Sequence, residues 1–287
     1  MQGTATIEKK IFNIKSEIDF TALALEIFHF QYHKNEVYHK FVEGLGVDTA
    51  TIKSYREIPF LPIEFFKTHK VVCGDFEPET VFQSSGTTGM ATSKHFIKDI
   101  RLYEQSLVRG FKLFFGKPDE HIFLALLPSY LERSGSSLVH MANRLIQLSK
   151  DKNSGFYLHD YDKLAAVLIK LKKQQKKVIL LGVTYALLDL AERFPLDFPQ
   201  LILMETGGMK GKRREMVREE LHSKLRNAFG VKDIYSEYGM TELLSQAYSK
   251  GRGIFSVPPW MKILIRDIND PLSLLPTGKN GGINVID

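Results

Sequence analysis

The sequence predicts an α/β fold in which a mostly parallel sheet is layered with helices. Short apolar runs with the length of buried strands alternate along the chain with longer segments whose apolar spacing is helical. Turns that contain glycine follow several of the strand-like runs, as expected where a strand passes into a helix. The 287 residues include 44% hydrophobic and 25% charged side chains, which is the composition of a globular protein with a substantial core.

The first third of the chain predicts a helix over residues 18–44, where apolar side chains form a dense helical face. Pro59 and Pro62 end this pattern, and the residues around them predict an extended, buried segment. The run TVFQ at 80–83 predicts a strand, and residues 93–115 predict a helix or a pair of helices. Further strands are predicted at 121–127, 177–182, 200–208 and 231–239, and further helices at 136–148, 161–173, 184–194 and 212–230.

Composition narrows the class of protein. The net charge is +6, but the basic side chains are mixed with 33 acidic ones along the chain, so only bulk charge favours nucleic acid and we expect no nucleic-acid partner. The single cysteine, Cys73, excludes an internal disulfide framework and a multi-cysteine metal site. No apolar run reaches the roughly 18 residues that a bilayer requires, and the first residues lack the apolar core of a signal peptide. We therefore expect a cytoplasmic protein with no membrane span.

The stretch FQSSGTTGMATSKH, residues 82–95, combines small hydroxyl side chains with two glycines and a following lysine. Such a composition makes an ordinary solvated turn, but it also exposes backbone N–H groups that can hold an anion. The stretch lacks the G-x-x-x-x-G-K-[ST] spacing of a kinase-type loop, and the chain has no G-x-S-x-G turn of a serine hydrolase. Composition alone leaves the turn and the phosphate cradle open.

Two further segments with unusual residues follow predicted strands, ETGGMKG at 205–211 and SEYGMTE at 236–242. In an open parallel sheet such strand ends meet at one edge, so we expect the three segments to line one cleft. Tyr238 could stack on a flat ring, Thr241 could donate to a phosphate oxygen, and Glu242 could hold Mg²⁺. Each also has a structural alternative: a half-buried tyrosine, an N-cap threonine and a first-turn glutamate.

Taken together, SSGTTG and YGMTE resemble the paired motifs of the adenylate-forming superfamily, which includes acyl-CoA synthetases, firefly luciferase and nonribosomal peptide adenylation domains. The resemblance implies an ATP site and the large N-terminal domain of these enzymes. The implied phosphate-binding loop comprises Ser84, Ser85, Gly86, Thr87, Thr88 and Gly89, with Lys94 displaced along the chain because MATSKH replaces the usual proline-lysine. The implied nucleotide site further comprises Gly207, Gly208 and Met209 along the adenine, Tyr238 and Gly239 facing the adenine, Thr241 at the α-phosphate and Glu242 at Mg²⁺.

From about residue 55 onward, the chain resembles the acyl-protein synthetase family more closely. It is carried by ordered matches such as IPFLPIEFFKTH, LLPSYLERSGSSLVHM, ETGGMKGKRREMVREELH and PPWMKILIRD. The resemblance implies an enzyme that activates a carboxylic acid, such as a fatty acid, with ATP, releases pyrophosphate and passes the acyl group from acyl-AMP to a thiol. Tyr130 and Arg133, after a predicted strand, are candidates for the acid site, although Arg133 could equally be structural.

The expected chemistry brings anions together, because a carboxylate attacks the α-phosphate. Catalysis then needs charge neutralisation and alignment, which we expect from Thr87, Thr88, Thr241 and Mg²⁺ at Glu242. The resemblance assigns residues 1–287 to the large domain, with 1–55 as a candidate helical extension, and the small C-terminal domain of related enzymes is not found in this sequence. Two alternatives remain: a coenzyme A ligase of the same fold, and a nucleotide-binding scaffold without catalysis.

Overall fold

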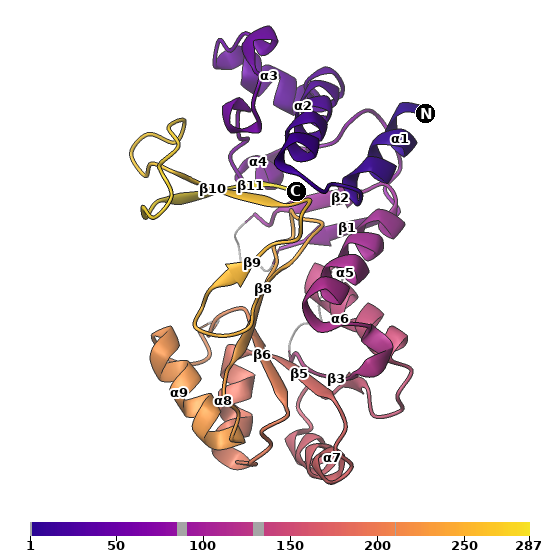
Figure 1. Ribbon diagram of the computed structural model, residues 1–287, viewed down its shortest axis with the longest axis vertical. Helices are drawn as coiled ribbons and strands as arrows, with labels where there is room; N and C mark the ends of the chain where they lie inside the picture. The colour runs from indigo at the N-terminus through magenta and orange to yellow at the C-terminus, as the bar shows by residue number, and fades with distance from the viewer. Residues whose placement is uncertain (1, 85–90, 129–134, 210) are drawn as a thin grey trace. The chain divides into compact units, whose positions relative to one another are not determined.

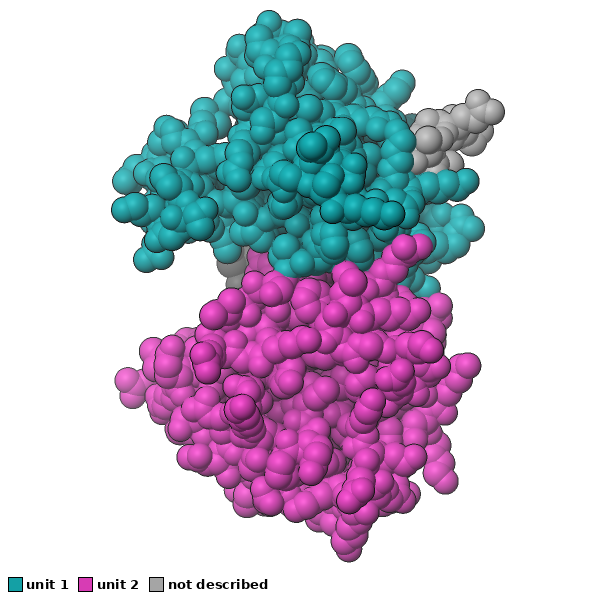
Figure 2. Space-filling model, viewed as in Figure 1, with its two compact units in different colours: residues 1–106, 241–245, 257–287 teal, residues 107–240, 246–256 magenta. Residues whose placement is uncertain are grey.

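The computed structural model describes residues 2–84, 91–128, 135–209 and 211–287 and divides the chain into two compact units (Figures 1 and 2). Unit 1 comprises Met1–Ser106, Thr241–Ser245 and Val257–Asp287, and unit 2 comprises Leu107–Met240 and Gln246–Ser256. The two units are therefore not two successive halves of the sequence. The chain leaves unit 2 inside the SEYGMTE motif, between Met240 and Thr241.

Unit 2 is built on a seven-stranded sheet with the order β4-β3-β5-β6-β7-β8-β9. The strands are β3 (Ile122–Leu126), β4 (Gly155–Phe156), β5 (Val178–Val183), β6 (Ile202–Thr206), β7 (Tyr235–Tyr238), β8 (Ala247–Ser249) and β9 (Phe255–Ser256). The pairings from β4 through β7 are parallel, and β8 and β9 are added antiparallel at one edge. Every residue of β3 and β5 is buried, as expected for strands covered by helices on both faces.

Helices cover both faces of this sheet. They are the C-terminal part of α5 (Ile100–Phe115), α6 (Ser137–Ser149), α7 (Tyr161–Lys173), α8 (Thr184–Arg193) and α9 (Arg218–Phe229). The crossover through α6 runs along the sheet in the opposite direction to those through α7, α8 and α9. Because parallel crossovers are right-handed, this reversal puts α6 on one face and α7 to α9 on the other. In Figure 1, α8 and α9 lie side by side, away from α6.

Unit 1 combines a helical N-terminal part with two small antiparallel sheets. Its elements are α1 (Gln2–Ile11), α2 (Glu17–Lys34), α3 (Glu36–Gly44), α4 (Phe65–Thr68), β1 (Thr80–Gln83), β2 (Lys94–Ile97), β10 (Lys262–Arg266) and β11 (Gly282–Ile286), together with the start of α5. Strand β1 pairs with β2, and β10 pairs with β11. Two apolar clusters hold the helices: Phe20, Ala24, Tyr55 and Leu264 in one, and Phe28, Tyr38, Val42 and Ile52 in the other.

Four expectations from the sequence need correction. The helix expected over 18–44 is interrupted at Asn35, whose side chain accepts a hydrogen bond from the Tyr38 N–H and so caps a new helix, α3. Residues 94–97 form strand β2 rather than the start of a helix. The segment after Pro62 contains the short helix α4. Helix α9 begins only at Arg218, so residues 212–217 are not helical.

The remaining predicted elements of unit 2 are confirmed. The three motifs were expected to follow strands of one parallel sheet. Strand β1, however, belongs to a separate two-stranded sheet of unit 1. Of the three motifs, ETGGMKG begins at the end of β6 and SEYGMTE begins on β7, at parallel strand ends of one sheet, whereas SSGTTG follows a strand of another sheet. No helix in the described part of the chain is both long and apolar enough to cross a membrane.

The tight packing at the end of β5 gives a first prediction. A Cβ at Gly182 would lie 2.6 Å from Cδ2 of Leu187, whose side chain is fully buried, and 3.3 Å from the Leu126 carbonyl oxygen. We expect Gly182→Ala to lower the free energy of unfolding by about 1–3 kcal/mol, measured by urea denaturation.

Gly110→Ala is the matched control for this substitution. No heavy atom lies within 4 Å of a Cβ built on Gly110, which is inside α5, so helix propensity should leave stability unchanged or raise it by up to about 1 kcal/mol. Equal unfolding midpoints for wild type and Gly182→Ala would contradict the packing argument.

Candidate functional site

The turns at the carboxyl edge of the unit 2 sheet are tied together by the first residues of α8. The Thr184 hydroxyl donates to the Gly207 carbonyl at 2.7 Å, and the Tyr185 hydroxyl donates to the Pro128 carbonyl at 3.2 Å. Since α8 follows β5, these bonds link the ends of β3, β5 and β6. The crossover direction reverses between β3 and β5, which makes this edge the position where open α/β sheets bind ligands.

The glycine-rich segment after β6 presents backbone at this edge. Gly207 adopts φ +66°, a conformation that favours glycine, and Gly207 and Gly208 are exposed. The Met209 side chain is only 2% exposed, and its carbonyl accepts a hydrogen bond from the Lys212 N–H at 2.9 Å. Of the three predicted residues, the two glycines therefore offer backbone at the surface, while Met209 anchors the segment in the core.

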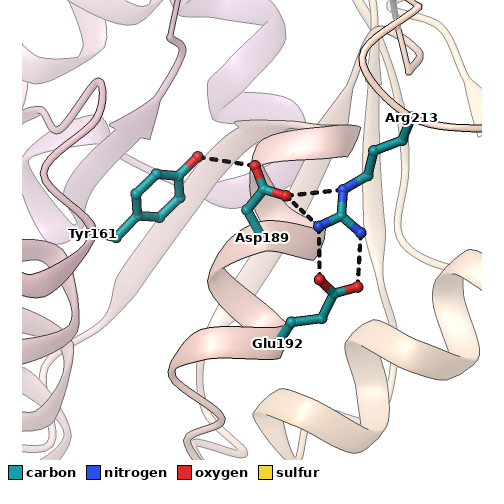
Figure 3. Close-up of polar contacts among 4 residues, drawn as sticks. All are labelled: Tyr161, Asp189, Glu192 and Arg213. Carbon is teal, nitrogen blue, oxygen red and sulfur yellow. Dashed lines mark hydrogen bonds and ion pairs between the residues drawn. The ribbon is translucent and has the colours of Figure 1, made fainter.

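Arg213 fastens the far end of the same segment to α8 (Figure 3). Its Nε–H donates to Oδ1 of Asp189 at 2.9 Å, and its two terminal nitrogens donate to the two oxygens of Glu192 at 2.7 Å each. One terminal nitrogen also donates to Asp189. The hydrogen bonds from Arg213 lower the pKa of Glu192, and Asp189 also accepts a bond from the Tyr161 hydroxyl of α7 at 3.4 Å.

This anchor was missed in the sequence, where Arg213 is one of several basic residues expected in a solvated helix. The planar guanidinium is suited to bidentate bonds with carboxylates, which a lysine could not form. The sequence contained one indication of this role. Arg213 stands six residues after Gly207, and the residues three and four positions before it are not acidic, so it has no helical ion-pair partner on that side.

The ends of β6 and β7 are joined by two reciprocal hydrogen bonds between buried side chains. Thr206 of β6 donates to Oε2 of Glu237 at 2.5 Å, and Ser236 of β7 donates to Oε1 of Glu205 at 2.6 Å. All four side chains are buried. Because side chains alternate along a strand, one bond lies on each face of the sheet.

Burial raises the pKa of Glu237 to about 7, since the charged carboxylate loses solvation there. The hydrogen bond from Thr206 opposes this rise, and the charge of Glu205 adds to it. On the other face, Nε2 of His222 in α9 lies 3.7 Å from Oε1 of Glu205, too far for a hydrogen bond, and has no hydrogen-bond partner among the described residues. No role was predicted from the sequence for these two glutamates, although acidic residues inside predicted strands were a visible signal.

Tyr238 and Gly239 end β7 at the same edge. The Tyr238 side chain is half-buried, its ring makes an edge contact with Phe255 at 6.2 Å, and its hydroxyl donates to Sδ of Met240 at 3.0 Å. A Cβ at Gly239 would lie 2.7 Å from Oε1 of Glu237, so a larger residue at this position would displace that buried carboxyl. Gly239 is exposed and, like Gly207 and Gly208, offers backbone to the surface.

The remaining predicted residues that the structure describes belong to unit 1. The ends of the SSGTTG loop are closed by two hydrogen bonds, from the Ser84 N–H to the Ser93 carbonyl at 3.1 Å and from the Ser93 N–H to the Ser84 hydroxyl at 2.9 Å. Lys94 follows on β2, opposite Gln83, and is exposed. The predicted residues Ser85, Gly86, Thr87, Thr88, Gly89, Tyr130 and Arg133 lie outside the described residues.

Thr241 and Glu242 begin the short segment Thr241–Ser245 that belongs to unit 1. Both are half-buried. Nδ1 of His95, on β2, lies 3.0 Å from the Thr241 carbonyl oxygen. Among the described residues, no group of three or more histidine, cysteine, aspartate or glutamate side chains forms a preformed metal cage.

Residues 11–287 match the family described as acyl-protein synthetase, LuxE. The chain belongs to this family. No protein with a curated description matches the acyl-protein synthetase chain in sequence.

Solved structures show that this family member has the fold of adenylate-forming ligases. An open conformation of 2-hydroxyisobutyryl-CoA ligase, in complex with 2-HIB-AMP and CoA, superimposes with a TM-score of 0.66 at 14% identity, covering 94% of this chain and 60% of the ligase. The postadenylation state of that ligase with 2-HIB-AMP gives a TM-score of 0.63 at 14% identity, with 94% and 58% covered. The acyl-protein synthetase chain thus spans about 60% of the length of these ligases.

The buried carboxyl of Glu237 gives a pH-dependent prediction. Its folded-state pKa of about 7 lies above the ordinary 4.5, so the folded protein binds this proton more tightly and loses stability as the pH rises from about 4.5 to about 7. Glutamine cannot ionise and keeps an oxygen that accepts from Thr206. We expect Glu237→Gln to gain up to about 3 kcal/mol over wild type at pH 8 and little at pH 4.5, measured by denaturation at both pH values.

Glu219→Gln, on the exposed side of α9, is the control and should show no pH-dependent difference from wild type. If Glu237→Gln were less stable than wild type at pH 8, the ionised carboxylate would be the favoured form and the prediction would be wrong.

The Arg213 anchor gives a prediction for the glycine-rich segment. Arg213→Ala removes the bonds from Arg213 to α8 and leaves the two carboxylates of Asp189 and Glu192 without this cation. We expect a loss of roughly 1–2 kcal/mol in unfolding free energy, since the side chain is 30% exposed. We also expect faster tryptic cleavage after Lys212 and Arg214.

Arg213→Lys should fall between wild type and alanine, because an ammonium cannot bind both carboxylates in the bidentate manner. Glu215→Ala, an exposed neighbour in the same segment, serves as the control. Unchanged cleavage in Arg213→Ala would show that the segment is held by other contacts.

Proposed function

We propose that this acyl-protein synthetase family member is an AMP-forming ligase, which activates a carboxylic acid with ATP to an acyl-adenylate and transfers the acyl group to a thiol. The observation that carries the proposal is the placement of ETGGMKG and SEYGMTE at the carboxyl ends of adjacent parallel strands, β6 and β7. There, exposed glycine backbone stands beside a half-buried tyrosine at the edge where such sheets bind nucleotides.

The reaction balances without a protein nucleophile. An oxygen of the substrate carboxylate bonds to the α-phosphorus of ATP, the bond from that phosphorus to the bridging β-phosphate oxygen breaks, and pyrophosphate leaves. In the second step, a thiolate bonds to the acyl carbon and AMP leaves with the former bond electrons. The first step joins two anions, so alignment and electrostatic stabilisation are the requirements on the protein.

The residues are proposed to divide this work. Gly207 and Gly208 lie along the adenine, Tyr238 and Gly239 face it, and Thr241 donates to the α-phosphate. The closed ends of the SSGTTG loop at Ser84 and Ser93 support its proposed role in holding phosphates. Lys94, exposed one residue beyond this closure, is proposed to meet phosphate charge.

Glu242 is proposed to hold Mg²⁺. Magnesium in nucleotide enzymes is commonly bound through one or two carboxylates plus substrate phosphates and water rather than by an all-protein cage. A half-buried single carboxylate with no metal cage among the described residues fits this donor set. When bound, the ion would supply positive charge beside the reacting phosphates.

The acid and the acceptor are also proposals. A fatty acid is favoured by the family, with Tyr130 and Arg133 as candidates for its site. Burial raises the pKa of the Cys73 thiol to about 11, which leaves little thiolate at neutral pH and argues against this residue as the acceptor. A protein thiol supplied by another chain or segment, or coenzyme A, would take the acyl group. With a single cysteine the chain can form no internal disulfide, which fits a reducing compartment, and we propose a cytoplasmic location.

Pyrophosphate exchange into ATP tests the proposed function. We expect exchange that depends on one acid from a panel of carboxylic acids of increasing chain length. Glu242→Ala should reduce it by about 100-fold or more, the effect of removing one preorganised electrostatic group, while the melting temperature stays close to wild type.

Glu220→Ala is the matched control, because Glu220 is an exposed glutamate on α9 paired with Lys224 and should keep full exchange. Product analysis with coenzyme A and with thiol-bearing proteins then separates the two acceptors. A folded wild-type protein that binds ATP but exchanges pyrophosphate with no acid would support the scaffold alternative instead.

A further inference from the structure

The segment Thr241–Ser245 is held inside unit 1 by three anchors, which come from four distant parts of the chain. It is a five-residue excursion, because the residues before and after it belong to unit 2. So short a segment has no secondary structure of its own to fix it. Beyond the last residue pair of β7 and β8, Tyr238 with Ala247, its position therefore depends on its anchors.

Two of the anchors lie at its C-terminal end. Oδ2 of Asp287, directly after β11, accepts hydrogen bonds from the Leu244 N–H at 2.6 Å and the Ser245 N–H at 2.9 Å. The buried Ser245 hydroxyl lies 2.8 Å from the Ser106 hydroxyl, and the indole N–H of Trp260 donates to both oxygens, at 3.0 and 3.1 Å. These bonds involve Leu244 and Ser245. The N-terminal end of the segment, with Thr241 and Glu242, is contacted by the third anchor.

The third anchor is His95. A carbonyl oxygen only accepts hydrogen bonds, so the 3.0 Å contact with Thr241 requires the proton on Nδ1 of His95. Burial lowers the pKa of His95, which favours the neutral ring, and the nearby Glu242 carboxylate acts in the opposite direction. The ring is also fixed by an edge contact with Phe66 at 5.9 Å. The charge of Glu242 therefore acts on the pKa of His95.

We propose that His95 is a positioning residue, whose Nδ1–H holds the Thr241 carbonyl and thereby sets the place of the Thr241 hydroxyl and the Glu242 carboxylate. For catalysis, this inference rests on the proposed function of those two side chains. It also makes β2 a mechanical link between two motifs, since His95 follows the SSGTTG loop by a few residues in sequence and bonds to the SEYGMTE motif.

Two substitutions separate the hydrogen bond from the packing. His95→Phe keeps an aromatic ring against Phe66 but removes the donor. His95→Asn loses the ring but places an amide N–H two bonds from Cβ, as Nδ1 of histidine is. We expect His95→Phe to reduce kcat/KM for MgATP in pyrophosphate exchange by about 10–100-fold, since small misplacements of reacting groups are costly, and His95→Asn to recover most of that loss.

His121 supplies the matched control in unit 2. Its Nδ1 makes the same kind of bond, to the Lys117 carbonyl at 3.1 Å, and burial likewise lowers its pKa. His121→Phe should cost stability but leave kcat/KM of the folded protein near wild type. Wild-type kcat/KM in His95→Phe, or a His95→Asn variant as impaired as His95→Phe, would overturn the positioning role.

Amide hydrogen exchange of the nucleotide-free protein provides a readout that does not depend on catalysis. We expect the backbone amides of Thr241, Glu242 and Leu243 to exchange about 10-fold faster in His95→Phe than in wild type, with protection restored in His95→Asn. Equal protection in His95→Phe and wild type would overturn the inference about the segment. Absence of pyrophosphate exchange in wild type, with the expected hydrogen-exchange pattern, would instead remove the proposed function and leave the anchoring in place.

Discussion

The reciprocal pair of hydrogen bonds between β6 and β7 is the constraint on which the candidate site depends. Each bond joins a buried hydroxyl of one strand to a buried glutamate of the other, one on each sheet face. Adjacent parallel strands already share backbone bonds, but the pairing of β6 with β7 covers only two residue pairs. The side-chain bonds extend this short ladder to the strand ends, where the two glycine-containing motifs begin.

Burying two carboxyls on adjacent strands of one sheet is costly. Desolvation penalises charge, and the raised pKa of Glu237 records that penalty. A pair of leucines would be cheaper to bury, but it would not fix the relative position of the strands, because apolar contacts are not directional. The Glu237 carboxyl also fills the space next to Gly239, where a Cβ atom would otherwise fit.

The SEYGMTE motif is divided between the two units, and each part is anchored within its own. Tyr238 and Gly239 are fixed by β7 and its neighbours in unit 2, whereas Thr241 is fixed by His95 in unit 1. Anchors on both sides of the Met240–Thr241 junction give the motif two independent supports. The glycine-rich segment of unit 2 follows the same pattern, with Thr184 at its start and Arg213 at its end.

The sequence by itself determined the alternation of strands and helices in unit 2, the positions of the two glycine-containing strand ends and the family, because these depend on local periodicity and on motifs of contiguous residues. It failed where the outcome depended on distant partners. Residues 94–97 are followed closely by a helix in sequence but pair with β1, and Asn35 splits a continuous apolar pattern by capping a new helix. Only the tertiary structure showed that SSGTTG follows a strand outside the parallel sheet, and that Arg213, Glu237 and His95 support the motifs. Their hydrogen bonds join residues 21 to 146 positions apart, and such a separation leaves no periodic trace in the sequence.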